Sequence, residues 1–517
     1  MLHKAGSYFE KLKVWHLLIV LGLVYGMLGI YNILPLRPQS VHQWAQCDRA
    51  SVAWNYYKGY ADFFHPRVNN TDNGTGITGL EFPIVQYFVS VLYRLFGFHE
   101  WLYRLTTLIV FTLGAISVFK LSYYFLKDKL LGLLIMLLYV CSPLLTFYSC
   151  SFIPDIYSLS FAMMGWSLLT RYTEYSSGTL LWRWFLALTV ACLIKPNSMI
   201  HLPVMWMFLY RNDIWTWKTP FRYTGYFVAI AGLSIVWYMY ASWLSKTYQS
   251  GVFLLEMRPP RSWQEVMDVW ERVSKDWLER IYHPVLLLLI LAVGIAFLFI
   301  LNPVKNKLSS YAVLMLAGAM GFLSLMLLQL SYHDYYIITM FPAIVFLIMV
   351  IGEGLRFVMK KQGTLVFGCL LLVSVGVEFY FAKTHLRTSH KKDNWKYGGL
   401  YNDKYFHADQ FLKEVGITEN DQVIIVFDHS PNIALYLLGM RGVSIPYRNL
   451  KETIMGYLHT GRFKYILYNT QSRITELSFE PTDYPIVPLA EQDGIQIFKV
   501  SSSFHPDART APLSPWN

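Results

Sequence analysis

Acidic side chains stand at the edges of the apolar runs of this chain, where a carboxylate faces the border between membrane and water. Asp48 lies in a polar, aromatic-rich loop (36–104) that follows the first apolar run of membrane length. Glu81 stands further along this loop, and Asp155 precedes a later apolar run. A charged group held against a bilayer is costly, so it usually has a function. Such a carboxylate can act as a general base for a hydroxyl or as a ligand of a hard cation.

The composition predicts a polytopic membrane protein. Of the 517 residues, 55% are hydrophobic, 17% are aromatic and 15% are charged, and the mean hydropathy is +0.34. These values lie outside the range of ordinary soluble proteins. The first apolar run, 14–34, has about 21 residues and is long enough for a bilayer core of roughly 30 Å. It lacks the small-residue cleavage site of a secretory signal, so we expect a retained helix.

Further apolar runs bring the expected number of crossings to about eleven. Two of them, 181–194 and 199–210, are short, so a re-entrant or broken pair around Lys195-Pro196 is an alternative to two full spans. The others lie at 101–125, 130–148, 156–171, 222–244, 284–302, 308–330, 335–351 and 363–381.

The short basic loops all fall on one side of the membrane, which the positive-inside rule makes cytoplasmic. The N-terminus is then cytoplasmic, and the outer side receives loops 36–100 and 245–283, two acidic turns and everything after Lys383. The net charge of +11 is largely explained by the cytoplasmic loops and anionic lipid headgroups. No nucleic-acid motif is present, so we expect no nucleic-acid partner.

The composition changes after residue 382, which predicts a transmembrane domain over 1–382 and a soluble domain over 383–517. Strand-like runs at 422–427 and 463–469 alternate with helix-like stretches at 404–415 and 431–438. This pattern is typical of a small α/β domain. Its Asp428-His429-Ser430 triplet cannot form a catalytic triad, because adjacent residues of an extended chain point to opposite faces.

The first outer loop contains two predicted amphipathic helices. Apolar residues recur at helical spacing between Arg49 and Lys58, and Pro83 begins a second such segment over 84–96. We expect both helices to lie in the membrane interface and to bring Asp48 and Glu81 toward one cavity.

The motifs of this loop resemble those of the GT-C membrane glycosyltransferases, in the branch of the lipid A aminoarabinose transferases and protein O-mannosyltransferases. That family shows an acidic pair, an amphipathic helix, P-R-L-N-G, F-E-K-P-P-L-x-Y-W and L-F-G…E…A-R-L, in this order. The matching pieces here are Asp48-Arg49, His65-Pro66-Arg67-Val68-Asn69, Leu80-Glu81-Phe82-Pro83, Leu95-Phe96-Gly97 and Glu100 to Arg104-Leu105. Arg49 replaces the second acid and Phe82 replaces the lysine.

The resemblance continues to about residue 380. Phe152-Ile153-Pro154-Asp155 is similar to the acidic motif of the second outer loop, and Ile194-Lys195-Pro196 to a T-K-G segment. Tyr332-His333-Asp334-Tyr335-Tyr336 is similar to a late P-Y-Y segment. Because Phe82 removes one phosphate ligand of the family, the phosphate must be bound elsewhere.

The resemblance implies transfer of a sugar from a polyprenyl-phosphate donor to an acceptor hydroxyl on the outer face. Phosphate is a good leaving group, so one base and a set of cations suffice, unlike glycoside hydrolysis with its two carboxylates. We expect Asp48 to be the base, with inversion at the anomeric carbon. Asp155 and Glu81 would position hydroxyls or share a divalent cation with His333 and Asp334.

The donor phosphate would be held by cations, since guanidinium groups bind phosphate in a bidentate manner. The candidates are Lys195, Arg67, Arg258 and Arg261, with His65 and Tyr335 as further substrate-binding residues. Loop 245–283, which carries Arg258 and Arg261, could close over the lipid donor as a lid.

Several readings stay open. Asp48 and Asp155 could be helix N-caps, and Lys195 could extend to the interface. A flippase for lipid-linked saccharides would also be polytopic, although it predicts internal repeats and charges deep within spans. Transfer of whole oligosaccharides is a third reading.

A glycan, a lipid or a protein could be the acceptor. A bacterial inner membrane is favoured, while two Asn-X-Thr matches at Asn69 and Asn73 keep an endoplasmic reticulum open.

Overall fold

The computed structural model describes residues 13–212, 219–253, 257–391, 403–428, 430–446, 450–470 and 479–504. The chain divides into two compact units. The helical unit comprises Met1–Pro35, Arg104–Trp237 and Glu256–Thr388. The sheet unit comprises Leu36–Tyr103, Tyr238–Leu255 and Ser389–Asn517, so it joins the first loop to the C-terminal segment. The domain boundary predicted at 382/383 stays a prediction.

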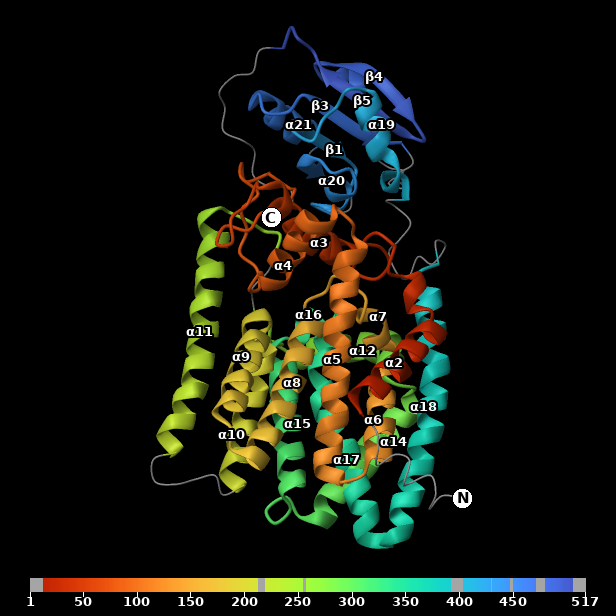
Figure 1. Ribbon diagram of the computed structural model, residues 1–517. Helices are drawn as coiled ribbons and strands as arrows, with labels where there is room; N and C mark the ends of the chain where they lie inside the picture. The colour runs from red at the N-terminus through yellow and green to blue at the C-terminus, as the bar shows by residue number, and fades with distance from the viewer. Residues whose placement is uncertain are drawn as a thin grey trace. The chain divides into compact units, whose positions relative to one another are not determined.

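Apolar helices dominate the helical unit (Figure 1). Among the described residues, six helices are long and apolar enough to cross a membrane, namely Trp101–Leu126, Tyr223–Thr247, Pro284–Leu301, Lys307–Leu325, Asp334–Met359 and Lys361–Ser389. Shorter apolar helices lie at Val14–Leu28, Ile84–Phe96, Lys129–Val140 and Gly178–Ile194. The predicted polytopic class is therefore confirmed, and the finer count of about eleven crossings stays a prediction.

The helical elements, with their labels, run as follows: α2 (Val14–Leu28), η1 (Ile30–Asn32), α5 (Trp101–Leu126), α6 (Lys129–Val140), α7 (Pro143–Tyr148), α8 (Asp155–Tyr175), α9 (Gly178–Ile194), η2 (Pro196–Ile200), α10 (His201–Arg211), α11 (Thr219–Thr247), α12 (Trp263–Asp276), α13 (Leu278–Ile281), α14 (Pro284–Leu301), α15 (Lys307–Leu325), α16 (Leu327–Leu330), η3 (Asp334–Met340), α17 (Phe341–Met359) and α18 (Lys361–Ser389).

Prolines divide several of the predicted runs. The run 130–148 forms α6 and α7, because Ser142 caps a new helix whose first residue is Pro143. The predicted break around Lys195-Pro196 is present: α9 ends at Ile194, and Lys195 has an extended backbone before η2. An extended residue between two helices leaves its side chain free of helical geometry, which suits a polar group in an apolar unit.

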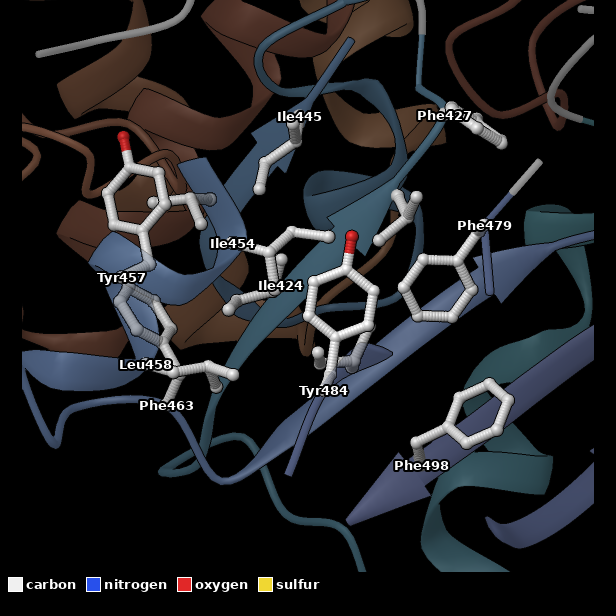
Figure 2. Packing of buried hydrophobic residues seen from close by; sticks show 13 residues of the cluster. Ile424, Phe427, Ile445, Ile454, Tyr457, Leu458, Phe463, Phe479, Tyr484 and Phe498 are labelled. Atoms are coloured by element: carbon white, nitrogen blue, oxygen red, sulfur yellow. The ribbon is translucent and has the colours of Figure 1, made fainter. Parts of the chain in front are cut away.

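The C-terminal segment forms the predicted small α/β fold. Its sheet, in the described residues, has the order β2-β1-β3-β5-β4, with β1 parallel to β2 and β3, and β5 antiparallel to β3 and β4. The elements are η5 (Asp403–Phe406), α19 (Ala408–Glu414), β1 (Gln422–Val426), α20 (Ile433–Leu437), β2 (Arg441–Ile445), α21 (Leu450–His459), β3 (Tyr465–Asn469), η6 (Pro481–Asp483), β4 (Ile486–Gln492) and β5 (Ile495–Val500). Figure 2 shows the core between sheet and helices, where Ile424, Ile454 and Phe498 are buried.

The first loop is part of the same unit as this sheet. Asn70 forms a parallel bridge with Gly442 of β2, and the amide of Thr71 donates to the Gly442 carbonyl at 2.7 Å. The loop thereby covers the edge strand β2, whose backbone groups would otherwise be open to pairing.

The two loop helices differ from each other in burial. α4 (Ile84–Phe96) has the predicted bounds, and Phe88, Leu95 and Phe96 are exposed on it, as an interfacial helix requires. The other helix, α3 (Gln43–Lys58), starts earlier than predicted and is buried on all sides from Ala45 to Tyr56. The prediction that it is amphipathic was wrong, because α4 and α20 of the same unit pack against it. Its predicted place in the interface plane stays a prediction.

Candidate active site

Asp48 lies in the interior of α3, with 5% of its surface exposed. The residue that precedes α3 is His42, so Asp48 is not an N-cap. Burial raises the pKa of Asp48 to about 7, while neighbouring Arg49 and a hydrogen bond from Asn432 oppose this shift and Glu81 adds to it. A carboxyl group with such a pKa is suited to accept a proton near neutral pH.

Arg49 forms a buried ion pair with Glu81. Its Nε lies 3.0 Å from Oε1 of Glu81, and its Nη2 donates to Oε2 at 3.4 Å. Nη1 donates to the Ala45 carbonyl at 3.1 Å, and the guanidinium lies over the ring of Phe253 at 5.0 Å from the centroid. This pair connects Glu81 to the helix that carries Asp48, and the predicted cavity between the two carboxylates stays a prediction. Arg49 neutralises the charge of Glu81.

Asn432 links the C-terminal α/β segment to α3. This residue is fully buried; its Nδ2 donates to Oγ of Ser51 at 2.9 Å, and its Oδ1 accepts from the amide of Asn70 at 3.1 Å. It also bonds the carboxylate of Asp48 and so stabilises the charged form. Sequence reasoning missed Asn432, although it directly follows the polar turn after β1.

That polar turn has a local role. Oδ2 of Asp428 accepts from the amide of Ala434 at 2.9 Å, and Oγ of Ser430 accepts from the amide of Ile433 at 3.1 Å. Both side chains therefore hold the start of α20, on which the position of Asn432 depends. His429 lies outside the described residues.

His65 and Arg67 lie in the same unit but bond other groups. Nδ1 of His65 pairs with Asp62 at 3.0 Å, and Nη1 of Arg67 donates to the Thr75 carbonyl at 3.4 Å. Asn69, two residues on, is fully buried and donates to the Met440 carbonyl at 2.8 Å. Burial makes Asn69 unsuited to carry a glycan in the folded chain.

In the helical unit, Asp155, Lys195 and Tyr335 come together. Nζ of Lys195 lies 3.3 Å from Oδ2 of Asp155, and 5.6 Å and 5.7 Å from the ring centroids of Tyr335 and Tyr336. Asp155 is the first residue of α8 and its side chain caps no amide, so the N-cap reading fails. Lys195 is placed by the break between α9 and η2, which turns the ammonium toward this carboxylate.

The turn before α8 is held by Arg104. Nη1 of Arg104 donates to the Cys150 carbonyl at 2.6 Å, and its guanidinium lies over the ring of Phe152 at 4.7 Å. The Arg-Leu motif at 104–105 therefore positions the loop that presents Asp155.

Two of the predicted metal ligands, Glu81 and Asp334, are engaged in ion pairs with arginines, while the ring of the third, His333, stacks on that of Tyr335. Asp334 pairs with Nη1 of Arg280 at 2.5 Å and accepts from the hydroxyl of Tyr148, while Glu81 pairs with Arg49. In the described parts of the chain, no three His, Cys, Asp or Glu side chains are arranged to hold a metal ion. Each of these carboxylates already has a guanidinium partner, so the residues do not fit a divalent cation as they stand.

Arg258 and Arg261 lie on an exposed segment just before α12. The carbonyl of Arg258 accepts from the amide of Leu328, and the amide of Arg261 donates to Glu265 at 2.6 Å. These contacts fix the backbone of the segment. A role of the two side chains in phosphate binding stays a prediction.

Part of the sequence resembles a known protein family. Residues 81–238 match the family model of the dolichyl-phosphate-mannose-protein mannosyltransferases. A comparison with curated protein sequences finds no match.

Solved structures show the same fold. The chain is similar to ArnT from Cupriavidus metallidurans in the apo state, with 12% identity, a TM-score of 0.59, and coverage of 94% of this chain and 99% of that chain. The same protein bound to undecaprenyl phosphate has 12% identity and a TM-score of 0.59, with coverage of 93% of this chain and 98% of that chain. A third similar structure is the oligosaccharyltransferase AglB from Archaeoglobus fulgidus in complex with an inhibitory peptide and a dolichol-phosphate. It has 9% identity and a TM-score of 0.51, with coverage of 89% of this chain and 70% of that chain. The GT-C fold that the motifs predicted is thereby confirmed.

Proposed function

We propose that this chain is a GT-C-type membrane glycosyltransferase, which moves a sugar from a polyprenyl-phosphate donor to an acceptor hydroxyl on the outer face of the membrane. The similar ArnT structure holds undecaprenyl phosphate and the AglB structure holds a dolichol-phosphate. Both ligands are long lipids that end in phosphate, which supports a donor of this class here.

The observation that carries the proposal is the state of Asp48. Its Oδ1 is buried and has no hydrogen-bond partner among the described residues, while Asn432 bonds the carboxylate and Arg49 lies beside it. Burial raises its pKa to about 7. A carboxylate on a helix, with one oxygen that accepts no hydrogen bond from the described residues, can receive the proton of an acceptor hydroxyl.

The reaction then needs one displacement. The acceptor oxygen attacks the anomeric carbon, its proton passes to Asp48, and the bond from that carbon to the phosphate oxygen breaks. Polyprenyl phosphate leaves with the bonding electrons. Because the acceptor oxygen attacks opposite the leaving phosphate in one displacement, the configuration at the anomeric carbon is inverted. The departing phosphate needs positive charge, and Lys195 of the helical unit, which pairs with Asp155, is the candidate that the motifs indicate.

The flippase reading explains less. It accounts for the apolar helices, yet it assigns no role to a buried carboxylate with a raised pKa in a loop outside the long apolar helices. The fold is shared with glycosyltransferases, and the enzyme reading gives Asp48 a role as the base.

Transfer of radiolabelled sugar tests the proposal. A panel of polyprenyl-phosphate sugars is offered to membranes that contain wild type, Asp48→Asn or the matched control Asp493→Asn, which changes an exposed carboxylate of the same unit. We expect wild type and the control to transfer from at least one donor, and Asp48→Asn to lose roughly 100-fold or more. Equal transfer by Asp48→Asn would remove Asp48 from the mechanism, and no transfer by wild type from any donor would favour the flippase.

A further inference from the structure

Three arginines of the sheet unit converge on one loop. Nη1 of Arg67 and Nη2 of Arg441 both donate to the carbonyl of Thr75, each at 3.4 Å. Nη2 of Arg462 donates to the carbonyl of Thr71 at 2.8 Å and to its hydroxyl at 3.2 Å. We call these three side chains the arginine cluster.

None of the members of the arginine cluster forms an ion pair among the described residues, whereas Arg37 and Arg49 of the same unit pair with Glu100 and Glu81 at 3.0 Å each. The charge of Asp72 acts on Arg462 from a distance and offsets part of its charge. Positive charges that are half-buried together without a counterion destabilise the fold.

The charges of the cluster repel one another. Burial lowers the pKa of Arg441, and the positive charges of Arg67 and Arg462 lower it further, while the charge of Tyr60 opposes the shift. The guanidinium of Arg441 lies over the ring of Tyr60 at 5.0 Å from the centroid. Nε of Arg67 and Nε of Arg441 are both buried without a hydrogen-bond partner in the described structure. The cluster therefore has unused donors as well as unbalanced charge.

The surrounding backbone is built for this arrangement. Oδ1 of Asn73 accepts from the amides of Thr75 and Gly76, at 3.0 Å and 2.7 Å, which closes the loop. Gly76 has a φ of +75°, and a Cβ there would lie 2.7 Å from the Val68 carbonyl. Gly74 has a φ of +87°, and a Cβ there would meet Nη1 of Arg462 at 3.8 Å. The positive φ favours glycine at both positions, and the missing Cβ of Gly76 lets the loop pack against the Val68 carbonyl.

The cluster is connected to the candidate base. Arg441 begins β2 and precedes Gly442, the bridge partner of Asn70. The amide of Asn70 bonds the same Asn432 that bonds Asp48. Within this unit, the backbone of β2 and a series of hydrogen bonds through Asn70 and Asn432 thus connect the arginine cluster to Asp48.

We propose that the arginine cluster is a binding site for a phosphate-type oxyanion carried by the acceptor. Guanidinium groups match the geometry of phosphate oxygens, and three of them supply the charge that such a group needs. An acceptor is favoured over the lipid donor because the cluster is made of loop and strand residues and contains no residue of a long apolar helix. This inference rests on the proposed transferase function.

A binding experiment tests the site without using catalysis. The full chain in detergent is titrated with inorganic pyrophosphate at low salt, as wild type, Arg441→Gln, Arg462→Gln and the control Lys499→Gln, which removes an exposed charge from β5 of the same sheet. We expect wild type and the control to bind equally, and each arginine variant to bind at least tenfold more weakly. Equal binding by all four would overturn the proposal.

Thermal unfolding distinguishes a lost site from a lost fold. We expect pyrophosphate to raise the Tm of wild type but not that of Arg441→Gln, and ligand-free Arg441→Gln to melt no lower than wild type, because one of three repelling charges is gone. If Arg441→Gln melts lower and Arg441→Lys restores the melting temperature without restoring binding, the cluster is structural and the proposal fails.

Transfer kinetics identify the source of the oxyanion. We expect Arg441→Gln to raise KM for the acceptor with KM for the donor unchanged; a rise confined to the donor would assign the cluster to the lipid phosphate instead and overturn the acceptor site. Asp48→Asn is expected to bind pyrophosphate as wild type does. The binding result is thus independent of whether Asp48 is the base.

Discussion

Asn432 donates a hydrogen bond to Ser51 at 2.9 Å, which joins the C-terminal α/β segment to the helix that carries Asp48. Ser51 lies about one turn after Asp48 and donates to the Asp48 carbonyl at 2.8 Å. The C-terminal segment therefore takes part in the geometry of the candidate base.

Replacement of Asn432 by Ala should change the pH dependence of transfer. The Asn432 hydrogen bond stabilises the charged carboxylate, so its loss raises the pKa of Asp48, and the acidic limb of kcat/KM against pH moves to higher pH. Near pH 7 we expect a loss of roughly tenfold. The exposed Asn420 of the same segment serves as the control in Asn420→Ala. An unshifted profile for Asn432→Ala would show that the bond does not act through Asp48.

Replacement of Asp48 by Asn should stabilise the protein while it abolishes transfer. The pKa of Asp48 is raised from 3.8 to about 7, so the folded chain holds more protons than the unfolded chain between these pH values. Stability therefore falls as pH rises through this window, by roughly 2–4 kcal/mol at pH 7. Asp48→Asn removes that loss.

Thermal unfolding at pH 5 and pH 8 measures this effect. We expect the advantage of Asp48→Asn over wild type to be larger at pH 8 than at pH 5. Equal differences at both pH values would mean that the buried carboxylate titrates normally.

The Arg49–Glu81 pair should be a matter of stability more than of chemistry. Arg49→Met or Glu81→Leu alone leaves a buried charge without its partner, which costs about 3–5 kcal/mol. The double variant should recover most of that loss, because neither charge of the pair remains. A double-mutant cycle of unfolding free energies checks this, and additive single losses would contradict it.

Lys195 should act on the donor. Its ammonium is 3.3 Å from Asp155 and is presented by the break before Pro196. Lys195→Met should raise the Kd for polyprenyl phosphate roughly tenfold to a hundredfold, while Lys246→Met, at an exposed position of α11, should leave it unchanged. Since the variant also leaves Asp155 without its cation, Asp155→Asn/Lys195→Met is measured beside it. Recovered donor affinity in the double variant would remove Lys195 from the donor site.

Much of the fold could be read from local patterns. The apolar runs follow from hydropathy alone, and the break at Lys195-Pro196 follows because proline has no amide to donate. Strands β1 and β3 follow from short runs of β-branched and aromatic residues. The bounds of α4 follow from Pro83 before it and Gly97 after it. Each of these features depends on neighbours within a few residues.

The candidate site could be predicted only in part. The motifs pointed to Asp48, Glu81, Asp155 and Lys195, and the structure pairs Asp155 with Lys195. They also suggested that α3 is amphipathic, yet α3 is buried on every side, because its polar residues face other polar residues of the same unit. Periodicity reports which residues avoid water, and it cannot tell burial against protein from burial in lipid.

The sequence by itself determined the membrane class, the order of the elements, the break beside Lys195 and the residue types available for sugar transfer. Only the tertiary structure decided that Arg49 neutralises Glu81, that Asn432 bonds Asp48, and that Arg67 meets Arg441 and Arg462. The physical reason is that Asn432, Arg441 and Arg462 are hundreds of residues from their partners along the chain. Such contacts arise when the edge of β2 pairs with Asn70, and no local pattern in either segment encodes that pairing.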